Sequence, residues 1–307
     1  IHVRGSFLDK GAQVSPAVPE LFAVPKSFQP GNRLEFARWL VGGKNPLVAR
    51  VVVNRFWQSY FGHGLVRTPD DFGAQGTPPS HPRLLDWLAA DLMDHGWDIK
   101  RTMKLLVTSG AYRQSSIAAA KTLAADPLNK WLARQGRWRL DAEMVRDNAL
   151  AVSGLLIDKI GGPSVYPYHP KGLWLELNNR PNYSRPYPQG TGEALYRRSL
   201  YTYWKRTVPP PSMATFDAPE REFCLVRRSR TNTPLQAFVM LHDPQFVEAA
   251  RHLAKRMIGE SKNPESRIKH GFRLATSRLP NEKEKAVLHR LFRERLAFYR
   301  KEPKAAK

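Results

Sequence analysis

The sequence predicts a mainly α-helical protein: a multi-helix single domain with long irregular, proline-rich loops and at most a little β structure. Three observations carry this prediction. Apolar residues recur at helical spacing along most of the 307-residue chain. Capping residues followed by proline open several of these segments. The 25 prolines also suggest many short helices joined by rigid loops.

The predicted elements fall into a lead, a helical domain and a tail. Residues 1–31 are extended and proline-rich, as expected of a linker from an upstream domain. The helical domain is expected over 32–302, and 303–307 read as a frayed tail. Helices are predicted over 32–41, 45–62, 82–96, 98–112, 126–135, 140–156, 233–243, 244 to about 255, 264–276 and 281–300.

Local capping signals justify several of these boundaries. Asn32 is a suitable N-cap, with Glu35 three residues later. Pro82 opens one helix, and Asp98 caps the next. The stretch that begins at Thr233 and Pro234 reads as a capping box with proline at the first helical position.

Two long segments lack helical periodicity. Residues 63–82 contain too many turn formers for a regular element. Residues 161–196 lose all periodicity, and such a long loop in a compact domain is usually functional or wraps a surface. Residues 196–207 alternate enough for a strand, although a helix also fits them.

The charge balance bears on possible partners. The chain has 49 Lys and Arg against 27 Asp and Glu, a formal net charge of +22. Such a surface attracts nucleic acid, anionic polysaccharide, acidic lipid or an acidic protein. A basic surface without a specific partner explains the same numbers. The cations are scattered rather than gathered into a basic tail.

Several classes of site find no support in the sequence. The single cysteine excludes an internal disulfide and a cysteine-rich zinc site. P-loop, G-x-S-x-G, H-E-x-x-H and C-x-x-C-H motifs are lacking, so we predict no metal site and no cofactor in this chain. No window approaches a membrane span, and no signal peptide opens the chain. The first residue is Ile1, which suggests a piece of a longer protein, so a missing signal peptide says little.

The stretch 216–238 holds the first candidate site. Asp217 and Glu220 could act as general acid and base, and Cys224 could be a nucleophile activated by nearby arginines. We favour a structural interpretation, in which the acids pair with arginines and Cys224 is buried. The arginines that this pairing would use are Arg227, Arg228 and Arg230.

A second candidate lies in the loop 69–82. Asp70, Asp71 and His81 offer oxygen and imidazole ligands that suit a divalent metal. Turn formation at the two aspartates and helix entry at His81 explain the same residues, and we favour that explanation.

A third candidate is the segment 174–206, where aromatic residues alternate with cations. Rings beside cations suit sugars or single-stranded nucleic acid, and they equally suit a loop held down by aromatic packing. The binding candidates, including two arginines from the first stretch, are Trp174, Tyr183, Arg185, Arg197, Arg198, Tyr203, Trp204, Arg227 and Arg228.

Several stretches in order resemble one family. They include NPLVARVVVNRFWQSYFGHGLVRTPDDFG, RLDAEMVRDNALAVSGLL and FDAPEREFCLVRRSRTNTPLQAF. Over residues 30–257 the chain is similar to the planctomycete-specific C-terminal domain of unknown function, found in exported multidomain proteins. The resemblance implies a periplasmic or cell-surface location. It also implies upstream cytochrome c-like and helical domains in the same polypeptide, with haem only in that upstream part. Members of this family often accompany sulfatase-like proteins, so the resemblance also suggests a link to polysaccharide breakdown.

These observations leave three functional hypotheses, and whether the chain is an enzyme stays open. The leading hypothesis is an accessory module that binds an anionic or carbohydrate ligand, or docks the cytochrome-bearing region. The alternative is a polysaccharide-active enzyme that uses acid and base carboxylates. The second alternative is a nucleic-acid-binding protein, which no recognisable binding motif supports.

Overall fold

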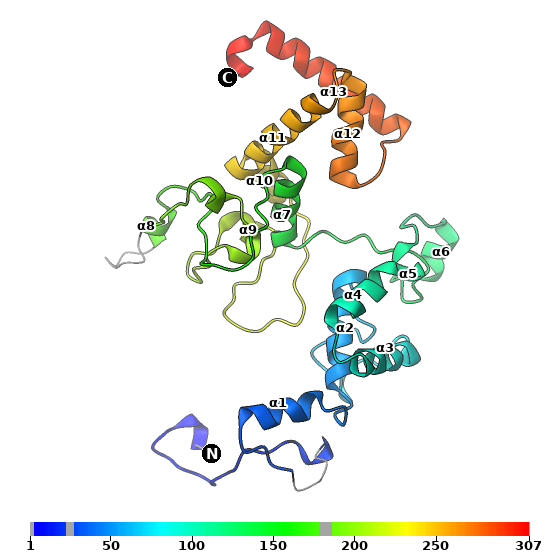
Figure 1. Cartoon of the computed structure of the whole chain (residues 1–307), viewed down its shortest axis with the longest axis vertical. Helices are drawn as coiled ribbons and strands as arrows, with labels where there is room; N and C mark the ends of the chain where they lie inside the picture. Colours follow the sequence, from blue (N-terminus) through cyan, green and yellow to red (C-terminus); the bar gives the residue numbers. More distant parts are fainter. Residues whose placement is uncertain (1–2, 23–27, 178–185, 307) are drawn as a thin grey trace. The chain divides into compact units, whose positions relative to one another are not determined.

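The computed structural model describes residues 3–22, 28–177 and 186–306. Its contacts divide the chain into two compact units, Ile1–Trp138 (unit 1) and Arg139–Lys307 (unit 2), and each is described by itself. Helices dominate the regular structure of both units, as the sequence predicts (Figure 1). In the described part of the chain, β structure is limited to isolated bridges, such as the parallel pairs Ile157–Arg197 and Val165–Thr202.

Unit 1 is a small helical assembly whose helices begin at local capping signals. Asn32 accepts a hydrogen bond from the Glu35 amide (3.0 Å), and Asp98 accepts one from the Arg101 amide (2.9 Å). Both caps are the ones that the sequence predicts. The helices of unit 1 are α1 (Arg33–Val41), α2 (Val48–Phe61), α3 (Pro82–Asp94), α4 (Ile99–Thr108), α5 (Gly110–Arg113) and α6 (Ala120–Ala125), after the short 3-10 helices η1 (Val3–Gly5) and η2 (Glu20–Phe22).

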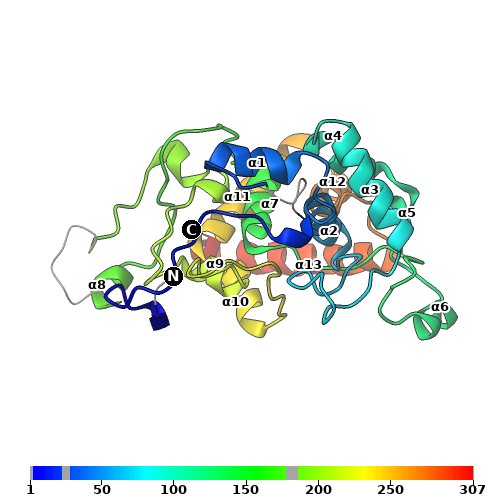
Figure 2. The same ribbon diagram turned by 90° about the horizontal axis from the view of Figure 1, so that it is seen from below.

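The core of unit 1 forms where α2 packs against α3 and α4 (Figure 2). Apolar side chains from the inner faces of these helices meet there, and burying each one fully is worth about 1.5–3 kcal/mol. Trp57 and Phe61 stack with 4.0 Å between ring centroids. The buried members are Val53, Trp57, Phe61, Leu65, Val66, Leu85, Leu88, Leu92 and Leu106.

One buried amide fixes the chain after α2. Asn54 is fully buried, and its side chain donates to the carbonyl of Val66 (3.1 Å) and accepts from the Val66 amide (2.9 Å). This pair of bonds mimics a strand partner and satisfies both polar groups of the side chain. The loop after α2 is therefore anchored to the helix twelve residues earlier.

Unit 2 contains the two longest of the described helices, and three of its α-helices begin with an Asx or Thr cap followed by proline. Thr233 and Gln236 form the predicted capping box of α10, and Asp243 accepts from the Gln245 amide (3.0 Å) at the start of α11. The α-helices of unit 2 are α7 (Ala142–Ser153), α8 (Leu173–Leu177), α9 (Pro211–Thr215), α10 (Pro234–His242), α11 (Pro244–Glu260), α12 (Pro264–Thr276) and α13 (Glu282–Lys301). The 3-10 helices are η3 (Gly192–Leu195), η4 (Ser199–Tyr201) and η5 (Pro303–Ala306).

A buried guanidinium ties α7 to the irregular segment of unit 2. α7 lies along α11 (Figures 1 and 2). From α7, Arg146 donates to the carbonyls of Leu195 (2.7 Å) and Arg197 (2.8 Å) and to the side chain of Gln245 on α11. Burial lowers the pKa of Arg146 to about 10, with Asp147 acting in the opposite direction, so the side chain stays charged at neutral pH.

Two predicted elements differ from the structure. The helix expected over 126–135 is a series of turns, because Asn129 and Leu132 take left-handed backbone angles (φ 49° and 56°) that a right-handed helix cannot contain. The segment 196–207 forms η4 and isolated bridges instead of a continuous strand. None of the helices in the described part of the chain is long and apolar enough to cross a membrane.

Candidate functional site

Asp217 lies near the start of the stretch 216–238, and its arginine partner comes from outside that stretch. The Arg139 guanidinium donates to Asp217 Oδ2, and the Thr231 amide and hydroxyl also donate to the carboxylate (2.8 and 2.9 Å to the same oxygen). Arg139 donates further to the Thr231 carbonyl (2.8 Å) and packs over the Phe216 ring. Asp217 therefore closes the loop between α9 and α10 around one guanidinium.

These contacts decide the protonation of Asp217. Burial alone would raise the pKa of this carboxyl, but the hydrogen bonds from Thr231 and the charge of Arg139 outweigh it and lower the pKa. A general acid needs a raised pKa, and a carboxylate with its oxygens already occupied is a weak base. The geometry therefore favours a structural role for Asp217.

The arginines of the same stretch pair with the first turn of α7. Arg228 binds Glu143 with both terminal nitrogens (2.6 and 3.2 Å), and Arg230 lies 3.4 Å from Asp141. Burial opposes ionisation of Glu143, yet the Arg228 hydrogen bonds lower its pKa overall. The arginines of this region thus pair with acids, but the carboxylates are Asp217 and those at the start of α7 rather than Glu220, which is exposed. Arg227 is also exposed.

Cys224 corrects a prediction. We expected a buried thiol, because free cysteine is among the most buried residue types. The structure places Cys224 at the surface, as a free cysteine in the irregular stretch between α9 and α10. The residues on either side of Cys224, from Arg221 to Leu225, are exposed as well, so this part of the stretch lies at the surface.

Most of the described aromatic residues of 174–206 pack against one another. Trp174 is 4% exposed; its ring meets Tyr187 edge-on (5.0 Å) and lies beneath the Lys205 ammonium (4.2 Å). Tyr203 stacks on Tyr166 with 4.8 Å between centroids. Of the two interpretations for this segment, the contacts match aromatic packing. Tyr183 and Arg185 lie outside the described residues.

The remaining candidates of this segment also have protein partners. Arg197 is buried, donates to the carbonyls of Lys159 (2.8 Å) and Gly161 (2.5 Å), and lies over the Tyr201 ring (3.8 Å). Trp204 donates to the Glu220 carbonyl (3.1 Å). Arg198 is half exposed and lies 3.9 Å from an Asp147 oxygen.

The loop candidates of unit 1 serve turns. Asp71 accepts a hydrogen bond from the Gly73 amide (2.7 Å), and His81 contacts the Ser80 hydroxyl (3.0 Å) at the entry to α3. Asp70 is exposed. Across the residues that the structure describes, no three His, Cys, Asp or Glu side chains are grouped so that they could hold a metal ion.

A pocket of about 430 Å³ lies in unit 1, and none of the described candidate residues from the sequence lines it. Its volume falls in the range of small-molecule sites, about 300–1,000 Å³. Trp138 and Leu128 supply apolar wall, while Arg137, Arg134 and Asn129 supply polar groups. The other lining residues are His63, Ser116, Ile117, Ala118, Leu123, Pro127, Gln135 and Gly136, so no carboxylate lines it.

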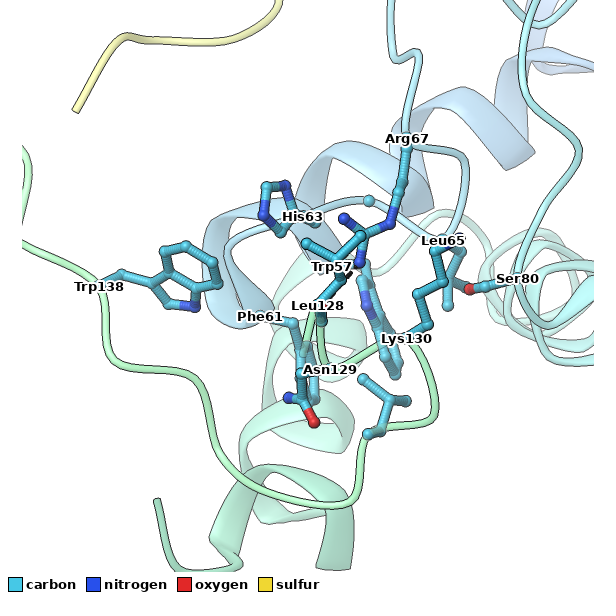
Figure 3. A pocket seen from close by; sticks show the side chains of 12 residues that line it. Trp57, Phe61, His63, Leu65, Arg67, Ser80, Leu128, Asn129, Lys130 and Trp138 are labelled. Carbon is cyan, nitrogen blue, oxygen red and sulfur yellow. Dashed lines mark hydrogen bonds between the residues drawn. The ribbon is translucent and has the colours of Figure 1, made fainter. Parts of the chain in front are cut away.

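A smaller cavity of about 20 Å³, enough for one water molecule, adjoins this pocket through shared residues (Figure 3). His63 and Trp138 belong to both and meet edge-to-face at 4.9 Å between ring centroids. Asn129 also lines both; its amide donates to the Arg134 carbonyl (2.7 Å), and its buried Oδ1 has no hydrogen-bond partner among the described residues. A buried acceptor of this kind is rare in proteins and usually binds an ordered water molecule.

Two glycines allow the indole of Trp138 to take its place. A Cβ on Gly62 would come within 2.0 Å of Trp138 Cε2, and a Cβ on Gly136 within 2.2 Å of Trp138 Nε1. The indole therefore lies directly on backbone, and 43% of the residue remains exposed. The pocket thus combines a fixed, accessible aromatic ring with cationic groups.

Sequence reasoning missed this pocket, although one signal for it was present. Arg137, Trp138 and Arg139 alternate cation and ring in the same way as the segment 174–206. The sequence predicts a helix over 126–135, and a helix there does not indicate the turns that place Leu128, Asn129 and Trp138 in one pocket lining with His63.

Together these features describe a basic, mainly helical protein with a pocket in unit 1 that is large enough for a small ligand. The ion pairs of Asp217 with Arg139 and of Glu143 with Arg228 stabilise the fold of unit 2. Residues 32–292 match the family model described as PSD1, a protein of unknown function (DUF1553). This match covers well over half of the chain, so the chain belongs to that family. No curated protein matches the chain, and no solved structure matches it.

Proposed function

We propose that the chain is a non-catalytic accessory module that binds a carbohydrate ligand in the pocket of unit 1. The observation that carries the proposal is the lining of that pocket, where the half-exposed indole of Trp138 lies beside hydrogen-bonding side chains. Indole faces stack on the apolar faces of sugar rings, and polar neighbours bind the hydroxyl groups. The volume of about 430 Å³ suits a short saccharide rather than a long groove-bound chain.

Two findings favour binding over hydrolysis. A glycoside hydrolase needs two carboxylates about 5–10 Å apart, one of them with a raised pKa. Asp217 instead has a lowered pKa and is held by Arg139 and Thr231. The pocket of unit 1 is lined without any Asp or Glu. These two findings support the accessory hypothesis against the polysaccharide-active alternative.

The resemblance supports a wider setting for this module. We propose that it works in an exported protein, beside cytochrome c-like and helical domains of the same polypeptide that hold any haem. In that setting, the cationic surface of this chain would also dock against the cytochrome c-like region. The complete gene tests this directly: a signal peptide and an upstream C-x-x-C-H motif support the proposal, and their absence overturns it.

A saccharide screen tests the binding function. The purified chain is applied to an array of neutral, carboxylated and sulfated oligosaccharides at low and physiological salt, with single-stranded DNA as a control. We expect salt-resistant binding to one sugar class, reduced at least tenfold by Trp138→Ala and unchanged by Trp131→Ala, an exposed tryptophan outside the pocket lining. Binding to every polyanion that vanishes at physiological salt contradicts the proposal, because it reports surface charge alone.

A further inference from the structure

We infer that the pocket of unit 1 selects a saccharide that carries an anionic group, and that Arg137 binds that group. This inference rests on the proposed carbohydrate-binding function and specifies its ligand. The ligand class is a sugar with a carboxylate or sulfate; the shared chemistry is a delocalised oxyanion next to a sugar ring. Guanidinium binds such oxyanions with two parallel hydrogen bonds.

The two arginines of the pocket differ in their remaining hydrogen-bonding capacity. Arg134 donates its terminal nitrogens to the carbonyls of Asp126 and Pro127 (both 2.9 Å), so its guanidinium holds the turn that forms the wall. Arg137 donates its Nε to the Ser116 hydroxyl (3.1 Å) and is exposed. It has no ion-pair partner among the described residues, so its terminal nitrogens are the cationic donors left for a ligand.

Arg137 is also held in position before any ligand arrives. The Gln135 amide donates to the Ser115 carbonyl (3.0 Å). The bond from Arg137 to Ser116 is a second connection between the chain around Gln135 and the chain around Ser115. Gln114 adds a bond to the Leu132 carbonyl (2.6 Å). The Nε bond to Ser116 restricts the guanidinium, which therefore loses less conformational entropy on binding than an unbonded arginine side chain, and this raises affinity.

The neighbours of Arg137 define the rest of the ligand. Trp138 follows it in sequence and is 43% exposed, so its ring can stack against a sugar in the pocket. With no carboxylate in the lining, an oxyanion meets no like charge in the pocket. The guanidinium of Arg137, which has no ion-pair partner among the described residues, and the exposed ring of Trp138 can together bind one charged sugar unit.

The test compares sugars that differ only in the anionic group. Isothermal titration calorimetry on the whole chain at physiological salt uses a glucuronic acid-containing trisaccharide, its glucose counterpart of the same linkage, and the 6-sulfated form of that counterpart. Variants Arg137→Gln and Arg137→Lys are set beside Arg83→Gln, which removes an exposed cation from α3 outside the pocket. Circular dichroism confirms that each variant is folded.

We expect at least one charged sugar to bind about tenfold or more tightly than the neutral one, the usual worth of a charge-assisted hydrogen bond. Arg137→Gln should remove that preference while leaving the neutral sugar's affinity in place, and Arg83→Gln should change neither. Comparing the affinities of the glucuronic acid-containing and the 6-sulfated trisaccharides shows whether the pocket prefers a carboxylate or a sulfate. Equal binding of charged and neutral sugars, or a preference that survives Arg137→Gln, overturns this inference but leaves the proposed function standing. Binding of none of the sugars overturns both.

Discussion

The indole of Trp138 lies so close to Gly62 that a Cβ on this glycine would come within 2.0 Å of Trp138 Cε2. Gly62 also has a φ of +83°, which residues with a side chain rarely adopt. The position is therefore restricted twice, once by the backbone and once by the ring that forms the wall of the pocket. The two restrictions can be separated by mutation.

Gly62→Ala should lower the free energy of unfolding by about 2–4 kcal/mol, combining backbone strain with overpacking against the indole. Gly96→Ala is the matched control, because Gly96 also has a positive φ (63°) but its Cβ would meet open space. This control should lose about 1–2 kcal/mol from the backbone term alone. Urea denaturation measures both. Equal losses would mean that Trp138 moves aside without cost.

Asp217→Asn should destabilise the protein by about 1–3 kcal/mol at pH 7, because it removes a charged acceptor from Arg139 and Thr231. The pKa of Asp217 is lowered in the folded protein, so its contribution is present above the unfolded value near 3.9. That contribution is lost as the pH falls through the folded pKa. The difference in the free energy of unfolding between the wild type and the variant should therefore become smaller below about pH 4.

Denaturant titrations at several pH values test this dependence. Asp70→Asn is the control, since Asp70 is an exposed carboxylate at the surface of unit 1. Its effect should stay within about 0.5 kcal/mol. If the loss of unfolding free energy caused by Asp217→Asn is constant with pH, or is larger in acid, the pKa of Asp217 is not lowered in the folded protein.

Arg146→Met should open the irregular segment of unit 2. The change leaves the Leu195 and Arg197 carbonyls without their buried donor, a loss of about 3–5 kcal/mol. Hydrogen–deuterium exchange reports it locally. Exchange should speed up at the amides of Ile157 and Val165, which bond to the carbonyls of Tyr196 and Tyr201.

Arg251→Met provides the control for that exchange experiment, because Arg251 is an exposed cation on α11. It should leave the exchange of Ile157 and Val165 unchanged. If Arg146→Met also leaves these amides protected, the guanidinium does not hold the segment in place.

Local sequence signals were sufficient for most helices. The caps at Asn32, Asp98 and Thr233 form the bonds that their residue types predict, because a cap reaches only two or three residues along the chain. The turn at Asn129 was missed for a related reason. Its left-handed backbone interrupts a stretch whose apolar spacing still favours a helix.

The partners of the arginines could not be predicted in the same way. Arg228 lies 85 residues from Glu143 in sequence, and Arg139 lies 78 residues from Asp217. The sequence favours pairing of acids with arginines, but the choice among carboxylates depends on how α7 packs beside the stretch after α9. The pocket depends on tertiary structure too, since Trp138 reaches its place only because Gly62 and Gly136 lack a Cβ.

Cys224 is an exposed free thiol, so its reactivity reports directly on its position at the surface. An exposed thiol should react with Ellman's reagent in the native protein at a rate comparable to that in denaturant. Cys224→Ser should change the free energy of unfolding by less than about 0.5 kcal/mol, because little packing is lost at an exposed position. A thiol that is protected until the protein unfolds, together with a serine variant that loses more than about 1 kcal/mol, would restore the buried position that the sequence suggested.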